Sequence, residues 1–181
     1  MQRVLVPRDH IARRVHELAG ELIVEYEGRE LTIVVVLTGA LTFTADLIRA
    51  LPLPLRIEPV SVSSYTGAAT RPHEATFRLP LPSDMQGRDV LIVDDIFDSG
   101  QTMDILSAAA RAAGARDVKR CALLRKARPD LPGRGELDYY GFDIPDEFVV
   151  GYGLDYNGYF RNLPDVAVLR IHAEETREEA T

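Results

Sequence analysis

The sequence predicts an α/β fold in which a parallel β-sheet is flanked by helices. Short apolar runs rich in Val, Ile and Leu recur along the chain, most clearly at residues 31–37 and 90–93. Such runs are typical of strands that are buried on both faces of a sheet. Segments with apolar residues at helical spacing alternate with these runs, and this alternation is typical of a parallel sheet.

The first part of the chain predicts a strand, a helix, a second strand and a second helix. Residues 4–6 predict a short strand. From Asp9, which we expect to be an N-cap, the apolar positions fall on one stripe of a helix: Ile11, Val15, Leu18, Leu22 and Ile23. Residues 31–37 form the first buried strand, a turn follows at 38–40, and residues 41–50 predict a helix that stops before Pro52.

The rest of the chain contains one long segment without any period, between further strands and helices. Residues 56–63 predict a strand, whereas residues 64–83 are rich in Thr, Gly, Ala and Pro and indicate a long mobile loop. A strand at 90–93 leads to a helix at 103–113, for which Gly114 is the expected C-terminal cap. A strand at 117–124, a loop at 126–135 and short strands at 148–150 and 166–171 complete the prediction.

Size and composition predict one globular domain over residues 1–181. Hydrophobic residues make up 46% of the chain and charged residues 27%, which is ordinary for such a domain. No apolar run approaches the length of a membrane span, so we expect no membrane partner. The net charge of −7 argues against nucleic acid as a partner, because domains that bind it usually carry a basic surface. The single cysteine, Cys121, excludes an intramolecular disulfide and favours a cytoplasmic location.

Residues 90–102 are the most informative stretch of the sequence. A buried strand leads into two adjacent carboxylates, Asp94 and Asp95, where the strand should end. Small and hydroxyl residues then precede a helix, so the backbone N–H groups of Ser99 to Thr102 would point outward at a helix N-terminus, which favours phosphate. The two carboxylates suit ribose hydroxyls and a magnesium ion, which prefers oxygen ligands.

This stretch resembles the signature of type I phosphoribosyltransferases, the enzymes that use 5-phosphoribosyl-1-pyrophosphate (PRPP). The family pattern is an apolar strand, two acidic residues, two apolar residues, a variable position, then Ser/Thr-Gly and a Thr. Asp98 occupies the variable position, as is typical of the hypoxanthine-guanine branch. The resemblance implies a general acid/base role for Asp98 at the purine N7, and it implies these PRPP-binding residues: Asp94, Asp95, Ser99, Gly100, Gln101 and Thr102. For Asp98 the alternative is an N-cap of the following helix.

The resemblance also implies contacts to PRPP from three other segments. Thr38 and Gly39 match the pyrophosphate loop, although familiar relatives have Lys or Arg where Thr38 stands; alternatively, Thr-Gly merely ends a strand. The pair Ser64 and Tyr65 matches the start of a mobile lid over residues 64–83. Arg161 matches an arginine that contacts pyrophosphate, and its alternative is a solvated surface charge.

Two further segments match the family's purine site. Lys126 matches a lysine that donates to the 6-oxo group, although alone it would be an ordinary solvated charge. Residues 140–156 are very similar to the purine-binding stretch, in which Phe148 would stack on the base; the alternative for Phe148 is core packing. The carbonyl groups of Val149 and Asp155 would accept from a 2-amino group. The Asp155 carboxylate would reach a second magnesium ion through water, which makes Asp94, Asp95 and Asp155 the expected metal residues.

The resemblance therefore implies a magnesium-dependent enzyme of purine salvage. It would transfer the phosphoribosyl group of PRPP to hypoxanthine or guanine, giving IMP or GMP and pyrophosphate. The implied fold adds a small hood, mainly from about residues 1–10 and 136–172, and the implied assembly is a homodimer or homotetramer. Two alternatives are a phosphoribosyltransferase that prefers xanthine and a non-catalytic regulator that binds PRPP or nucleotide and nucleic acid. The regulator fits poorly, because such a protein needs a basic face and tolerates loss of Asp98 or Lys126. This chain has a pI near 5.1 and retains both residues.

Overall fold

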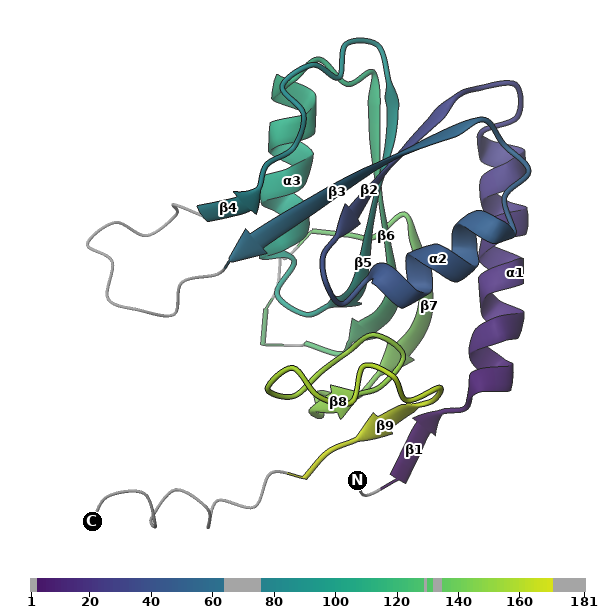
Figure 1. Cartoon of the computed structure of the whole chain (residues 1–181), viewed down its shortest axis with the longest axis vertical. Helices are drawn as coiled ribbons and strands as arrows, with labels where there is room; N and C mark the ends of the chain where they lie inside the picture. The colour runs from purple at the N-terminus through teal and green to yellow at the C-terminus, as the bar shows by residue number, and fades with distance from the viewer. Residues whose placement is uncertain (1–2, 64–75, 129, 132–134, 171–181) are drawn as a thin grey trace.

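Two β-sheets organise the chain in the computed structural model, which describes residues 3–63, 76–128, 130–131 and 135–170 (Figure 1). Within these ranges the large sheet has six strands, in the order β4 (Thr76–Leu79), β3 (Leu55–Ser63), β2 (Leu31–Val36), β5 (Asp89–Phe97), β6 (Asp117–Lys126) and β7 (Tyr139–Ile144). The small sheet has three strands, in the order β1 (Arg3–Val6), β9 (Val166–Val168) and β8 (Val149–Val150).

The parallel pairing of β2, β3, β5, β6 and β7 brings the carboxyl ends of these strands to one edge of the large sheet. Val35 pairs with Val93, and Phe97 pairs with Arg125, so the turns that follow β2, β5 and β6 are neighbours. The small sheet lies beyond this edge (Figure 1). Because ligands of open α/β sheets bind at the carboxyl ends of the strands, the small sheet closes the side where a site is expected.

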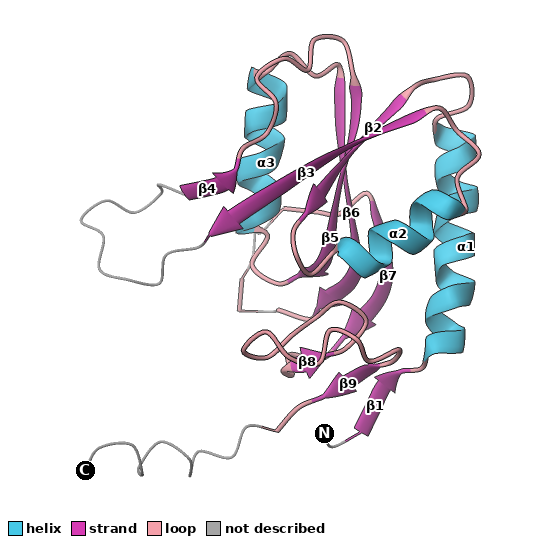
Figure 2. Ribbon diagram, viewed as in Figure 1, coloured by secondary structure: helices cyan, strands magenta, loops and turns pink. Residues whose placement is uncertain are grey.

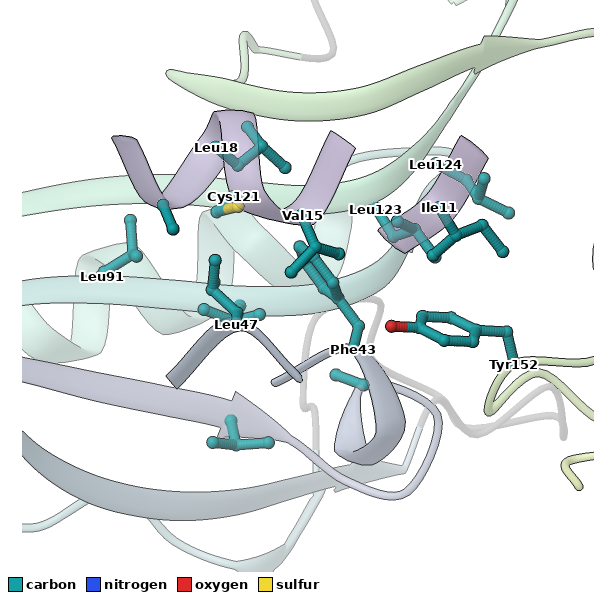
Figure 3. Packing of buried hydrophobic residues seen from close by; sticks show 14 of the residues in the cluster. Ile11, Val15, Leu18, Phe43, Leu47, Leu91, Cys121, Leu123, Leu124 and Tyr152 are labelled. Atoms are coloured by element: carbon teal, nitrogen blue, oxygen red, sulfur yellow. The ribbon is translucent and has the colours of Figure 1, made fainter. Parts of the chain in front are cut away.

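In the described part of the chain, helices cover both faces of the large sheet: α1 (Arg8–Glu25) and α2 (Leu41–Arg49) lie on one face and α3 (Gln101–Ala112) lies on the other (Figure 2). Successive strand residues alternate between the two cores, since side chains of a strand point to opposite faces. In β5, for example, Leu91 and Val93 belong to the core beneath α1 and α2, whereas Val90 and Ile92 belong to the core beneath α3. Figure 3 shows the first core, where Leu18 lies near Cys121 and Val15 lies near Phe43.

The α/β class, the parallel strands with flanking helices and the small hood are confirmed by this arrangement. The strand β1 from the N-terminal segment pairs with β9 from the C-terminal segment, and β9 pairs with β8. The strand β7 falls within residues 136–172, the range predicted for the hood, but it pairs with β6 in the large sheet. None of the helices in the described ranges combines the length and the apolar character that crossing a membrane requires.

Several predicted boundaries were wrong. The helix α1 begins at Arg8 after the extended residue Pro7, which is its N-cap, so Asp9 lies inside the first turn. Residues 76–79, which were predicted to be loop, form β4, an antiparallel edge strand on β3. The strand β7 was not predicted, because Gly141 and Asp143 interrupt its apolar pattern. The prediction that Gly114 ends a helix is confirmed, since α3 stops at Ala112 and Gly114 has a φ angle of +93°.

Candidate active site

The adjacent carboxylates Asp94 and Asp95 lie inside β5 rather than after it, because the strand continues to Phe97. Asp94 is only 8% exposed. The N–H of Asp95 donates to Asp94 Oδ1 at 2.9 Å, and the N–H of Ile96 donates to Asp95 Oδ1 at 2.9 Å. Burial raises the pKa of both carboxyl groups, and the charge of Asp95 raises the pKa of Asp94 further. Such a pair is stabilised by a cation or by hydrogen-bond donors.

The turn after β2 packs directly against Asp95. A β-carbon at Gly39 would lie 1.8 Å from Asp95 Oδ2, so glycine is required for this approach. A second backbone layer follows, since a β-carbon at Gly153 would lie 2.2 Å from the carbonyl oxygen of Gly39. The peptide bond between Leu37 and Thr38 is cis, and Thr38 is exposed. The turn at Thr38 and Gly39 thus follows the end of β2, as the alternative interpretation predicts, and it also brings backbone against the Asp95 carboxylate.

The turn after β5 forms one wall of a pocket of about 270 Å³. Its lining includes Val36, Val62, residues 94–100, Thr102 and Met103. Gly100, with a φ angle of +81°, is the N-cap of α3, so the first N–H groups of this helix follow it directly. The N-cap is Gly100, and the N–H of Gln101 donates to Ser99 Oγ at 3.4 Å, so the alternative prediction that Asp98 is the N-cap residue is wrong. Gln101 is exposed and is not part of the lining.

A second pocket, of about 240 Å³, adjoins the first because Asp95, Ile96 and Asp98 line both. The other lining residues are Lys126, Phe148, Val149, Leu154 and Asp155. Four of these five, all but Leu154, were predicted to bind the purine. Phe148 is 43% exposed, which does not fit the alternative of core packing. Tyr156 contacts the Phe148 ring edge-to-face, with centroids 5.7 Å apart and an angle of 86° between the planes.

Lys126 and Asp98, which both line this second pocket, form an ion pair. The Lys126 Nζ lies 3.2 Å from Asp98 Oδ2 and 3.0 Å from Asp146 Oδ1. Arg128 also binds the Asp98 carboxylate. Sequence reasoning identified Lys126 and Asp98 but missed the roles of Arg128 and Asp146, because each follows a strand as an ordinary loop charge with no motif to mark it.

Arg161 and Asp155 bind each other at the side of the Gly39 turn. The Arg161 Nη2 lies 2.7 Å from Asp155 Oδ1, and its Nη1 donates to the carbonyl of Gly153 at 2.5 Å. Burial raises the pKa of Asp95, and the positive charge of Arg161 opposes that rise, so the guanidinium acts on this carboxylate. The alternative of a solvated surface charge is therefore wrong for Arg161.

The carboxylates fit a magnesium ion. Among the described residues, no group of three or more His, Cys, Asp or Glu side chains could hold a metal ion by itself. Magnesium does not need such a group, because it is usually bound through one or two carboxylates together with water and substrate phosphates. The pair Asp94 and Asp95 supplies ligands of this kind in the lining of the pocket that the turn after β5 forms. Of the predicted site residues, Ser64 and Tyr65 lie outside the described residues.

The sequence matches the family model described as "Phosphoribosyl transferase domain" over residues 5–157. The chain belongs to this family. The matched range includes residues 90–102, which carry the predicted signature, and all lining residues of the two pockets. Arg161 lies just outside this range.

Named relatives are similar over nearly the whole chain. A hypoxanthine-guanine phosphoribosyltransferase of Mycobacterium avium is 40% identical over 176 residues, which cover 93% of this chain and 86% of that protein. The corresponding protein of Bacillus subtilis is 38% identical, with 94% of each chain covered. The bifunctional protein TilS/HprT of Listeria innocua is 40% identical over 94% of this chain, but the chain spans only 26% of that longer relative.

A solved structure supports the same grouping. The crystal structure of a hypoxanthine-guanine phosphoribosyltransferase from Bacillus anthracis, with a HEPES molecule in its active site, superposes with a TM-score of 0.86. The two chains are 33% identical, and the match covers 94% of this chain and 99% of the other.

Replacing Gly39 by alanine should destabilise the protein, since the new methyl group must displace the Asp95 carboxylate. Overpacking of this kind typically costs about 1–3 kcal/mol, which urea unfolding would measure as a lower free energy of unfolding. The matched control is Gly20→Ala in α1, where a β-carbon would meet nothing within 4 Å. The control should be as stable as the wild type or gain about 0.5–1 kcal/mol. Equal stability of the two variants would contradict the packing described for Gly39.

Proposed function

We propose that this chain is a magnesium-dependent hypoxanthine (guanine) phosphoribosyltransferase of purine salvage. A 6-oxopurine displaces pyrophosphate from C1 of PRPP, and the products are IMP or GMP and pyrophosphate. The observation that carries the proposal is that Asp98, Lys126 and the exposed Phe148 line one pocket, which adjoins the pocket formed by the turn after β5. The names of the relatives from Mycobacterium avium and Bacillus subtilis support the same activity.

PRPP binds across the carboxyl ends of β2 and β5. The backbone N–H groups of the turn from Ser99 to Thr102 bind the 5-phosphate at the N-terminus of α3. Asp94 and Asp95 hold the ribose hydroxyls and a magnesium ion, which supplies charge neutralisation for the pyrophosphate leaving group. The backbone of Thr38 and Gly39 and the guanidinium of Arg161 bind pyrophosphate. This chain has no cation at position 38, so its own backbone carries more of that contact.

The purine binds in the second pocket. Phe148 stacks on the ring, and its face is fixed by the edge-to-face contact with Tyr156. Lys126 donates to the 6-oxo group, and the 6-amino group of adenine cannot accept from an ammonium. The carbonyl groups of Val149 and Asp155 accept from the 2-amino group of guanine. The Asp155 carboxylate contacts Arg161 and the N–H of Gly158, and its remaining lone pairs suit a water-mediated contact to a second magnesium ion.

Asp98 acts on the proton at the purine N7. As N9 forms a bond to C1, the bond between C1 and the pyrophosphate oxygen breaks, and Asp98 accepts the N7 proton. The role of the protein is thus to position the two substrates and to move one proton at a stated atom. A regulator that binds nucleic acid is a weaker reading, because the chain has a pI near 5.1 and retains both Asp98 and Lys126.

The proposal extends to assembly and location. We expect a homodimer or homotetramer, and the relative from Trypanosoma cruzi, with a TM-score of 0.85 and 35% identity, was studied for the role of its C-terminal region in oligomeric state. We also expect a cytoplasmic protein. Its Cys121 is buried, and burial raises the pKa of this thiol to about 12, as suits a structural cysteine.

A spectrophotometric screen of free bases with PRPP and magnesium tests the proposed function. Hypoxanthine and guanine should be turned over and adenine barely, because only the first two present an oxygen to Lys126. Reactions without PRPP are the control. Adenine turnover with a kcat/KM equal to that of hypoxanthine would make the purine assignment wrong. Turnover of no base would favour the regulator, and turnover of xanthine above the others would favour the alternative substrate.

The Asp98→Asn variant tests the proton transfer. Asparagine keeps the shape of the side chain but cannot accept the proton, so kcat should fall on the order of a hundred- to ten-thousand-fold. PRPP affinity and melting temperature should stay near wild type, since backbone groups hold the phosphate. The matched control is Asp104→Asn, which removes a carboxylate that pairs with Arg120 and lines neither pocket. A kcat of Asp98→Asn within a few-fold of the control would remove Asp98 from the mechanism.

A further inference from the structure

Arg128 follows the last residues of β6 and binds the Asp98 carboxylate from outside the purine pocket. Its Nη1 contacts Asp98 Oδ1. Two more of its nitrogens bind Asp130 side-on, with Nε 3.0 Å from Oδ1 and Nη2 2.8 Å from Oδ2. The side chain is 21% exposed and is not part of the pocket lining. The guanidinium therefore joins a loop carboxylate to the proposed acid/base residue.

Lys126 and Arg128 share two carboxylates. Lys126 Nζ lies 3.2 Å from Asp98 and 3.0 Å from Asp146. Arg128 contacts Asp98 directly, and its Nε lies 3.7 Å from Asp146 Oδ2. These four side chains form a closed ring of alternating charge, which we call the rim ring. Asp130 holds the outer side of the ring through Arg128.

The proposed reaction places conflicting demands on this ring. Lys126 must direct its ammonium to the purine oxygen, but Asp98 and Asp146 both compete for it. The Lys126 side chain is only 13% exposed, so little water is available to replace a lost partner. Asp98 must keep its direction when Lys126 turns to the base. Lys126 and Arg128 both bind the Asp98 carboxylate, so Arg128 still holds it when Lys126 turns to the base.

We propose that Arg128 is a positioning residue that holds Asp98 and Asp146 while Lys126 binds the 6-oxopurine, an inference that rests on the proposed function. Arginine suits this role better than lysine, because its planar guanidinium binds Asp130 through two nitrogens and keeps a third for Asp98. Arg128 transfers no proton, since a guanidinium stays charged in proteins. Arg128 fixes the position of the Asp98 carboxylate and, by neutralising part of its charge, weakens its competition with the purine for Lys126.

The Arg128→Ala variant tests this inference in assays with hypoxanthine and PRPP. Loss of a charge-assisted hydrogen bond and of the Asp98 orientation should lower kcat/KM for hypoxanthine on the order of 10- to 100-fold. The KM for hypoxanthine should rise and kcat should fall, whereas the KM for PRPP stays within about twofold. Arg128→Lys should recover only part of the loss, because it restores the charge without the planar fork.

Arg125→Ala is the matched control. Arg125 is close in the chain and also cationic, but its guanidinium binds Asp143 and stacks on Tyr140, 3.7 Å from the ring centroid. Because Arg125 and Lys126 are adjacent strand residues, their side chains point to opposite faces. The control should keep its kcat/KM within a few-fold of wild type, a range typical of surface changes. A second variant, Asp130→Asn, leaves Arg128 in place and weakens its anchor, so it should show a smaller loss of the same kind.

Two results would overturn the inference while the proposed function stands. In the first, the wild-type protein turns over hypoxanthine, and the kcat/KM of Arg128→Ala lies within about twofold of that of the Arg125→Ala control. The other is a rise of both KM values together with a fall in melting temperature, in Arg128→Ala and Asp130→Asn alike, which would indicate a structural role only. Failure of the proposed function is distinguishable, because the wild type itself would then turn over neither hypoxanthine nor guanine, and the inference would fall with it.

Discussion

The close approach of the Gly39 turn to the Asp95 carboxylate is the constraint on which the site depends. Gly39 packs against the Asp95 carboxylate and Gly153 packs against the carbonyl of Gly39, so three segments far apart in the sequence are in contact. They are the turn after β2, the end of β5 and the loop that follows β8. Because Gly39 has no side chain, the backbone N–H groups of its turn can approach a ligand held by the carboxylates closely. The parallel sheet makes this possible, because it brings the ends of β2 and β5 to one edge.

The charged residues near the Gly39 turn form two groups that are stabilised in different ways. Burial makes the ionised forms of Asp94 and Asp95 costly in the absence of a partner, and the raised pKa of each carboxyl group expresses this cost. A cation bound with a phosphate ligand would offset it. In the second pocket, by contrast, the charged side chains bind one another: Lys126 and Asp98 are members of the rim ring. A chain with a net charge of −7 can thus still suit an anionic substrate, because local donors and a bound cation decide the site.

Much of the candidate site was predictable from sequence, because its chemistry sits where apolar strand patterns end. Asp95 and Lys126 each border such a run in the parallel pair of β5 and β6, which brings them together. Phe148 borders the run of β8, which belongs to the small sheet beyond that edge. The strand ends themselves were not predictable, since β5 carries its carboxylates inside the strand and β7 is interrupted by Gly141. The contacts of Arg128 could not be predicted either. They depend on how two loops fold back at the sheet edge, and no periodic pattern encodes that.

Calorimetric titration of PRPP into the full chain, with magnesium or with EDTA, tests the central claim most directly. The claim is that the buried carboxylate pair and the Gly39 turn form a single site for PRPP together with a cation. The account predicts measurable binding in magnesium and an affinity lower by at least about tenfold in EDTA, which corresponds to about 1.4 kcal/mol. Equal affinity in the two buffers would contradict the account, because the carboxylates would then bind the substrate without the cation that their burial requires.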